Sequence, residues 1–212
     1  MKLILDNLAC ERGGRRLFSA LSRRIGAGEG LLVEGPNGTG KTTLLKTIAG
    51  LLRPTAGSTR LEGGGAEESL GEQCHLIGHL PGVKRALSVA ENYRFWTAYL
   101  GKDAGAEPDE EGLARLGLAD LADLPAGVLS AGQRRRLALA RLYAAPRPVW
   151  LLDEPAEALD AASKRLLARM IGNQLEGGGI VVAVSHTALR CKFAQSLRLG
   201  SPARRPAARA RR

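Results

Sequence analysis

A glycine-rich stretch with one lysine and one hydroxyl residue has the residue types and spacing that bind phosphate groups. Residues 35–42, Gly-Pro-Asn-Gly-Thr-Gly-Lys-Thr, match the pattern G-x-x-x-x-G-K-[ST] at every fixed position. A triphosphate is bound by backbone N–H groups turned inward around it, which requires glycine wherever a Cβ would block the approach. Lys41 is expected to reach the β- and γ-phosphates, and Thr42 to offer its hydroxyl to Mg²⁺. The candidate phosphate-binding residues are Gly35, Pro36, Asn37, Gly38, Thr39, Gly40, Lys41, Thr42 and Thr43.

Two acids follow a second apolar run and complete the chemistry. Asp153 and Glu154 come directly after Val-Trp-Leu-Leu at 149–152. In a phosphate-loop protein, the second contact to Mg²⁺ comes from an acid at the end of a strand, directly or through water. Asp153 is in that position. Glu154, one residue on, can lie beside the γ-phosphate and polarise a water for in-line attack. Glu154 is therefore the candidate general base.

The segments around the phosphate loop supply the strand and the helix that it requires. Residues 30–34 have the pattern of a short buried strand. Leu44, Leu45, Ile48, Leu51 and Leu52 recur at helical spacing, which predicts a helix that continues until Pro54 stops it. A glycine-rich turn without function is the alternative, since the chain holds 27 Gly, but the lysine, the hydroxyl and both flanks favour the phosphate site.

The remaining pattern predicts an α/β fold. Strands at 2–8, 15–25 and 59–62 are expected to form a small antiparallel sheet. Apolar strands at 74–78, 149–152 and 179–185 alternate with helices, which indicates a mostly parallel sheet covered on both faces. We expect one domain at 1–200, with a helical subdomain inserted at about 83–145.

A capping box, Ser-Val-Ala-Glu at 88–91, begins one helix of that subdomain. The helix carries Tyr93, Phe95, Trp96 and Tyr99, which are half of the chain's eight aromatic residues. Their spacing favours packing inside the subdomain, and a docking groove for a partner helix is the alternative.

Composition and charge limit the classes of protein. The 212 residues are 44% hydrophobic and 25% charged, as in a soluble globular protein. No run approaches the roughly 18 apolar residues of a membrane helix, and an acid at Asp6 argues against a secretory signal, so the protein is expected to stay in the cytoplasm. Cys10, Cys74 and Cys191 are too dispersed for a disulfide framework or a zinc site.

The net charge of +10 comes partly from residues 201–212, which contain five arginines and no acid. A disordered, solvated tail is the expected explanation, with contact to anionic lipid headgroups as the alternative.

Together, the motifs resemble those of ABC-type ATPases over nearly the whole chain. They are the phosphate loop, Leu-Ser-Ala-Gly-Gln at 129–133, Leu-Leu-Asp-Glu-Pro at 151–155, Ala-Leu-Asp at 158–160 and His186 after a strand. The resemblance implies a P-loop NTPase fold, the ABC nucleotide-binding domain, with a RecA-like core sheet. It implies a homodimer that holds ATP between the phosphate loop of one chain and Ser130, Gly132 and Gln133 of the other. His186 would then hydrogen-bond the γ-phosphate and help to position water.

Three residues depart from that family's pattern. His79 stands where most members have a glutamine that senses Mg²⁺ and the transport partner. Arg12 stands where an aromatic residue usually stacks on adenine, and its planar guanidinium could stack instead. Glu157 stands where a small or amide residue is common, which is expected to lower the hydrolysis rate.

Several stretches resemble one subfamily closely, the haem-exporter ATPases of cytochrome c biogenesis, CcmA. The stretches are 8–12, 17–18, 33–38 and, above all, 78–84 leading into 91–96. The short end after His186 also fits. The resemblance implies membrane partners of the CcmB, CcmC and CcmD type. It also implies ATP hydrolysis linked to haem export or to release of the haem-loaded chaperone CcmE, and a peripheral place on the cytoplasmic face of the bacterial inner membrane.

Three other functions are weighed against this one. An ATPase subunit of another small exporter would share the cassette but not the stretch 78–96. A soluble ABC-type ATPase that acts on nucleic acid or ribosomes is suggested by the basic charge, but such proteins usually carry two cassettes, and no nucleic acid is expected here. A small-molecule kinase or GTPase is disfavoured because no N-K-x-D motif is present.

Overall fold

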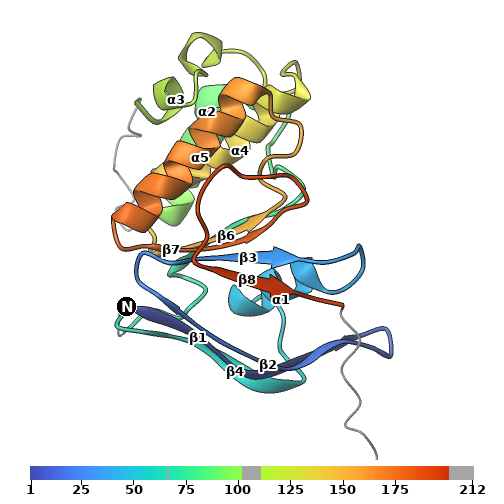
Figure 1. Cartoon of the computed structure of the whole chain (residues 1–212). Coiled ribbons are helices and arrows are strands. Elements are labelled where there is room, and N and C mark those ends of the chain that lie inside the picture. Colours follow the sequence, from blue (N-terminus) through green and yellow to red (C-terminus); the bar gives the residue numbers. More distant parts are fainter. Residues whose placement is uncertain (66, 102–110, 201–212) are drawn as a thin grey trace, which may run out of the picture.

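The structure is a computed structural model that describes residues 1–65, 67–101 and 111–200. Two β-sheets lie one above the other, with one helix between them and the remaining helices on the far side of the larger sheet (Figure 1). This arrangement confirms the predicted α/β class, with a parallel core sheet and a small antiparallel sheet. The basic segment 201–212 lies outside the described residues.

The larger sheet has the strand order β5-β6-β7-β3-β8, and all of its neighbouring strands are parallel. The strands are β3 (Gly30–Glu34), β5 (Cys74–Ile77), β6 (Val149–Asp153), β7 (Ile180–Val184) and β8 (Gln195–Arg198). Every residue of β6 and β7 is buried, as expected for strands covered on both faces. Because parallel strands end at the same edge, the acids that follow β6 are brought close to the loop that follows β3.

The smaller sheet has the order β2-β1-β4 and is antiparallel. It contains β1 (Lys2–Arg12), β2 (Arg15–Gly26) and β4 (Ala56–Glu62). Gly13 and Gly14 join β1 to β2, both with positive φ (57° and 73°), which is the backbone of the favoured two-residue hairpin turn. The hairpin turn holds Arg12 at the end of β1, opposite Arg15.

Helix α1 (Lys41–Ile48) lies between the two sheets and buries Leu44, Leu45 and Ile48 in their common core (Figure 1). The predicted extension to Pro54 was wrong. Gly50 has φ of 74°, and the N–H groups of Gly50 and Leu51 donate to carbonyls of the last helical turn. A left-handed glycine ends the helix there, so Leu51 is 64% exposed although it continues the apolar spacing.

The other helices cover the opposite face of the larger sheet. They are α2 (Val89–Leu100), α3 (Glu111–Arg115), α4 (Ala131–Ala144) and α5 (Ala161–Glu176), with a 3₁₀ turn at Ala119–Leu121. The predicted capping box is present, because Ser88 and Glu91 bond reciprocally at the start of α2. No helix in the described parts of the chain is long and apolar enough to cross a bilayer. The division into a domain and an inserted subdomain at 83–145, which includes residues outside the described ranges, stays a prediction.

His75 is a buried titratable group in β5, and it makes the fold sensitive to acid. The ring is 3% exposed, and its Nε2 donates to the Ala145 carbonyl at 2.7 Å. The pKa of His75 is lowered to about 4, chiefly by burial; the hydrogen bond to Ala145 raises the pKa, and the charges of Arg147 and Arg141 lower it. The unfolded chain takes up this proton below a pKa of about 6.5, whereas the folded chain does so only near 4. Stability is therefore expected to fall by up to about 3 kcal/mol as the pH drops through this window.

Urea unfolding of the wild type and of His75→Gln between pH 7.5 and 4.5 measures this contribution. Glutamine retains an N–H donor for Ala145 but does not titrate, so its stability should depend less steeply on pH. Equal pH slopes for the two proteins would show that His75 is not the titrating group.

Candidate nucleotide and catalytic site

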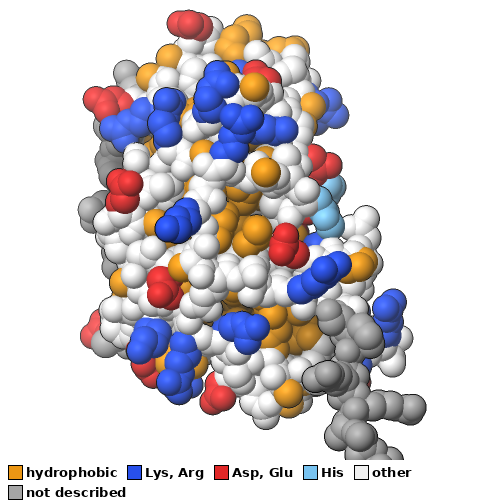
Figure 2. Space-filling model, in the orientation of Figure 1, with side chains coloured by type: hydrophobic (Ala, Val, Ile, Leu, Met, Phe, Trp, Pro, Cys, Tyr) orange, Lys and Arg blue, Asp and Glu red, His pale blue; other side chains and the backbone are white. Residues whose placement is uncertain are grey.

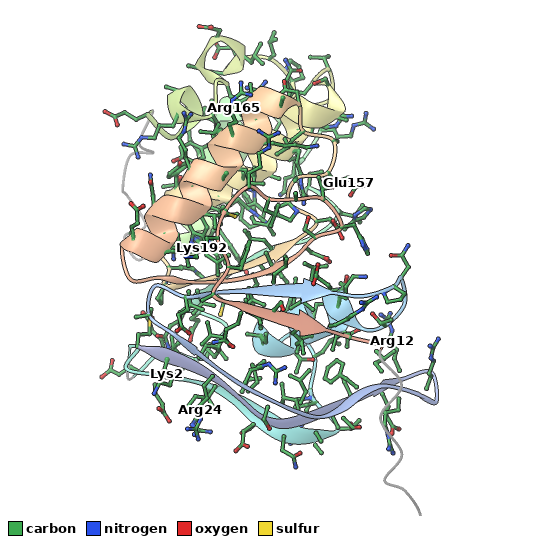
Figure 3. All side chains as sticks on the ribbon, in the orientation of Figure 1. Lys2, Arg12, Arg24, Glu157, Arg165 and Lys192 are labelled. Carbon is green, nitrogen blue, oxygen red and sulfur yellow. The ribbon has the colours of Figure 1, made fainter. Side chains whose placement is uncertain are left out.

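A cavity of about 620 Å³ opens at the carboxyl ends of the parallel strands, where Asp153 ends β6 and Val184 ends β7. Arg12 and Glu157 lie on this side of the molecule, whereas Lys2 and Lys192 lie toward the other side (Figure 3). The cavity residues come from the hairpin of β1 and β2, the phosphate loop and the start of α1, the loop after β5, and the ends of β6 and β7 with the segments that follow them. They are Arg12, Leu17, Asn37, Gly38, Gly40, Lys41, Thr42, Thr43, His79, Asp153, Glu154, Glu157, Val184, His186 and Thr187.

The phosphate loop has a backbone that only glycine can adopt at two points. Gly35 has φ of 142°, and a Cβ there would lie 2.4 Å from the Leu199 carbonyl oxygen. Gly40 has φ of 99°, and a Cβ there would lie 2.9 Å from the Cβ of Leu17. Gly40 is also the N-cap of α1 and provides no side-chain cap. The first N–H groups of α1 are thus free of a side-chain partner, which fits an anion at this end of the helix.

Lys41 keeps its ammonium group against the loop. Its Nζ donates to the carbonyls of Gly35 at 2.6 Å and Pro36 at 2.9 Å. Thr39 Oγ1 also donates to Pro36, which tightens the same turn. Of the nine predicted phosphate-binding residues, Gly35, Pro36 and Thr39 shape the loop without lining the cavity, and the other six line it.

Thr42 and Asp153 are brought together from positions 111 residues apart. Thr42 Oγ1 donates to Asp153 Oδ2 at 2.7 Å, and Asp153 is buried. A hydroxyl and a carboxylate are the hard oxygen ligands that Mg²⁺ prefers. The pair therefore fits the metal contact that was predicted from the sequence.

Glu154 occupies a strained turn beside the cavity. Its φ is 48°, which is uncommon for a residue with a side chain, and its N–H donates to the Val184 carbonyl at 2.9 Å. The backbone N–H of His186 donates to Glu154 Oε2 at 3.1 Å. The ring Nε2 of His186 lies 3.5 Å from the other carboxylate oxygen, Glu154 Oε1. Within the described residues, Oε1 is a buried oxygen without a hydrogen-bond partner. The Glu154 side chain as a whole is 20% exposed and lines the cavity, so its carboxylate can accept a proton from a molecule there.

His79 and Glu157, which the sequence presents as two separate departures, form a pair. His79 Nδ1 lies 2.9 Å from Glu157 Oε2, and both side chains line the cavity. The contact joins the loop after β5 to the loop after β6. Only the folded structure places the two residues together, because 77 intervening residues separate them in the chain.

Ser130, Gly132 and Gln133 do not line this cavity. Ser130 caps α4, and it forms a second capping box with Gln133: Gln133 N–H donates to Ser130 Oγ at 3.2 Å, and Gln133 Oε1 accepts from Ser130 N–H at 2.7 Å. A Cβ at Gly132 would lie 3.0 Å from the Ala158 carbonyl oxygen. The structure therefore places these three predicted ATP contacts outside their own chain's site.

Sequence reasoning missed four residues of this region. Leu17, Val184 and Thr187 line the cavity, and Arg135 is buried and bonds to the backbone behind the catalytic acids. Apolar and hydroxyl residues carry no distinctive signal, and Arg135 stands among three consecutive arginines. Nothing in that run indicates which guanidinium turns inward.

Comparisons with known proteins agree with this geometry. The ABC transporter family model matches residues 18–157. The cytochrome c biogenesis ATP-binding export protein CcmA of Nitrobacter winogradskyi is 48% identical, over 96% of this chain and 100% of that protein. The protein of the same name from Bradyrhizobium diazoefficiens is also 48% identical, over 96% and 100%. Among solved structures, a putative ABC transporter ATP-binding protein from Pyrococcus furiosus has a TM-score of 0.78 and 25% identity, and covers 94% of this chain and 98% of its own.

Proposed function

Because the chain belongs to the ABC transporter family, and within it to the CcmA proteins of cytochrome c biogenesis, we propose that its ATP hydrolysis drives haem export or release of haem-loaded CcmE. The chain is an ATPase subunit that serves cytochrome c biogenesis. The observation that best supports a catalytic site is the Thr42–Asp153 hydrogen bond, with the carboxylate of Glu154 beside it.

Binding of the triphosphate is assigned to the phosphate loop and the start of α1. The N–H groups of the loop and the Lys41 ammonium would hold the β- and γ-phosphates. Thr42 and Asp153 would hold Mg²⁺, which when bound neutralises charge on the phosphate oxygens. Arg12 would stack its guanidinium on the adenine, since it lines the cavity at the end of β1.

Hydrolysis is assigned to Glu154 with His186. The carboxylate of Glu154 would take a proton from the attacking water, while the backbone N–H of His186 holds its Oε2 in place. His186 lines the same cavity, so its ring could reach the γ-phosphate. His79 would sense the bound nucleotide through the loop that it begins, in place of the more usual glutamine.

A second copy of the chain would complete each site. Ser130, Gly132 and Gln133 lie at the start of α4 and outside their own cavity, so their proposed contact with the γ-phosphate requires a head-to-tail homodimer. The positive end of α4 would then face the γ-phosphate of the partner chain.

Mixing two inactive variants tests the dimer. Lys41→Ala and Gly132→Asp are each expected to be inactive alone. In a mixed dimer both defects fall in one site, and the other site is intact. Random pairing should therefore restore about a quarter of the wild-type ATPase rate. If mixed dimers form but stay inactive, the proposal that each ATP is held between two chains is wrong.

Integral membrane subunits of the CcmB and CcmC type, with the small CcmD, are the proposed partners, and they would hold the chain at the cytoplasmic face of the inner membrane. The surface of this chain on which these subunits would dock includes the loop 79–84 and α2. Of the four aromatics on α2, Tyr93 is in the core, whereas Phe95, Trp96 and Tyr99 contact one another and Tyr99 is 71% exposed. Leu80 is also exposed, and Lys84 Nζ lies 4.2 Å from the centre of the Phe95 ring. Exposed aromatic clusters of this kind mark interaction sites.

The charge on the face shown in Figure 2 does not favour a nucleic-acid function. On the face shown in Figure 2, Lys and Arg side chains gather over α5 and, separately, over the antiparallel sheet, with apolar side chains and single charges of both signs between them. A nucleic-acid interface is marked by one basic patch or stripe, and the two basic groups on this face do not join into one.

A further inference from the structure

Arg135 is a buried guanidinium that joins three segments around the catalytic residues. It lies in the second turn of α4 and is 3% exposed. Its Nη2 donates to the carbonyls of Asp153 at 2.8 Å and Glu154 at 2.7 Å, and its Nε donates to Pro155 at 3.3 Å. Its Nη1 donates to the carbonyls of Gly78 at 2.8 Å and His79 at 3.4 Å. One side chain therefore connects α4, the turn after β6 and the loop after β5.

These contacts are specific to Arg135 within its run of three arginines. Arg134 donates to the carbonyl of Leu129, and Arg136 donates to those of Leu116 and Gly117. Among the hydrogen bonds of the described residues, neither neighbour bonds to the turn that carries Glu154.

The partners of Arg135 are backbone carbonyls, and acids stand nearby. Burial lowers the pKa of Arg135, while the charges of Glu157, Asp153 and Glu154 act in the opposite direction. A planar guanidinium with several donors in fixed directions can serve five carbonyls at once, which the single ammonium of lysine cannot do.

The turn at Glu154 needs such support. Glu154 has φ of 48°, and a residue in this region of the backbone map keeps its conformation only when its surroundings hold it there. Arg135 bonds to the carbonyls of Asp153, Glu154 and Pro155, so the peptide groups on both sides of Glu154 are held. The direction of the Glu154 carboxylate follows from this backbone.

We propose that Arg135 is a positioning residue that aligns the carboxylate of Glu154 and the His79 loop with the start of α4. In the dimer, α4 carries the residues assigned to the partner chain's ATP. Arg135 would thus couple the two sites of the dimer. When Ser130, Gly132 and Gln133 contact the ATP in one site, Arg135 would align Glu154 in the other site. The inference rests on the proposed function, because it assumes that Glu154 is the base.

The first test compares Arg135→Gln and Arg135→Lys with Arg147→Gln as a matched control. Arg147 also bonds to backbone carbonyls, those of Gly71 and Cys74, but away from the cavity. Arg135→Gln is expected to lower kcat by about 100-fold with less than about a 3-fold change in KM for ATP, since a small misplacement of a catalytic group has effects of this size. Arg135→Lys should recover part of kcat, and Arg147→Gln should keep the wild-type kcat. Thermal melts identify the folded variants; if Arg135→Gln does not fold, Arg135→Lys provides the same test.

The second test is a double variant, measured in single turnovers with enzyme in excess. If Arg135 acts through Glu154, Arg135→Gln should not slow Glu154→Gln by more than about 3-fold. Two independent effects would multiply, and a further loss of about 100-fold would overturn the inference. If Arg135→Gln folds and keeps the wild-type kcat while Glu154→Gln is inactive, the inference about Arg135 is wrong but the catalytic role of Glu154 stands. An active Glu154→Gln would overturn both the inference and the proposed catalytic role.

Discussion

Glu154→Gln is expected to bind ATP as well as the wild type and to hydrolyse it at least about 100-fold more slowly, the usual contribution of a general base. Glutamine has nearly the same shape, so its side-chain oxygen can still accept the N–H of His186, which holds the carboxylate in the native protein. What it lacks is the negative charge of the carboxylate, and with it the ability to accept a proton.

Binding and turnover are measured separately for this variant. ATP affinity is followed with a fluorescent analogue, and turnover by release of inorganic phosphate. ATP should also trap the variant as a dimer in gel filtration, because the step that reopens the dimer is blocked. A variant that retains most of its turnover would show that Glu154 is not the base.

Lys41→Ala is expected to lose both ATP binding and hydrolysis. Lys41 Nζ is held at the loop by the carbonyls of Gly35 and Pro36, and among the described residues no other lysine lines the cavity. A charge-assisted hydrogen bond contributes about 1.5–3 kcal/mol, so losing contacts to two phosphates should weaken ATP binding by at least about 100-fold.

Lys46→Ala is the matched control for Lys41→Ala. Lys46 lies in the last turn of the same helix and does not line the cavity. The control should bind and hydrolyse ATP as the wild type does, and calorimetric titration with ATP and Mg²⁺ compares the two. Equal affinities for Lys41→Ala and the wild type would remove Lys41 from the site.

The parts of the site that the sequence could predict are those that follow a local rule. The phosphate loop is continuous in the chain, and its glycines and lysine are required by the backbone itself. Asp153 and Glu154 were predictable because an apolar strand delivers them to the edge where the other strands end. The same rule placed His186 after β7.

The misses involve contacts that no local rule contains. β8 is a four-residue strand with one buried side chain, too short and too exposed for a periodic signal. The apolar spacing of α1 continues past Gly50, while the left-handed glycine ends the helix. The pairing of His79 with Glu157 and the inward turn of Arg135 depend on how separate loops pack.

The proposed role in cytochrome c biogenesis is tested most directly by what the protein binds in the cell. Tagged Glu154→Gln protein is purified from gently solubilised membranes in the presence of ATP, and the proteins that accompany it are identified by mass spectrometry. We predict recovery of the membrane subunits of cytochrome c maturation, and their loss when Phe95 and Tyr99 on α2 are both replaced by serine. Recovery of nucleic acid or ribosomal proteins in their place would contradict the transport role, although the ATPase site would stand.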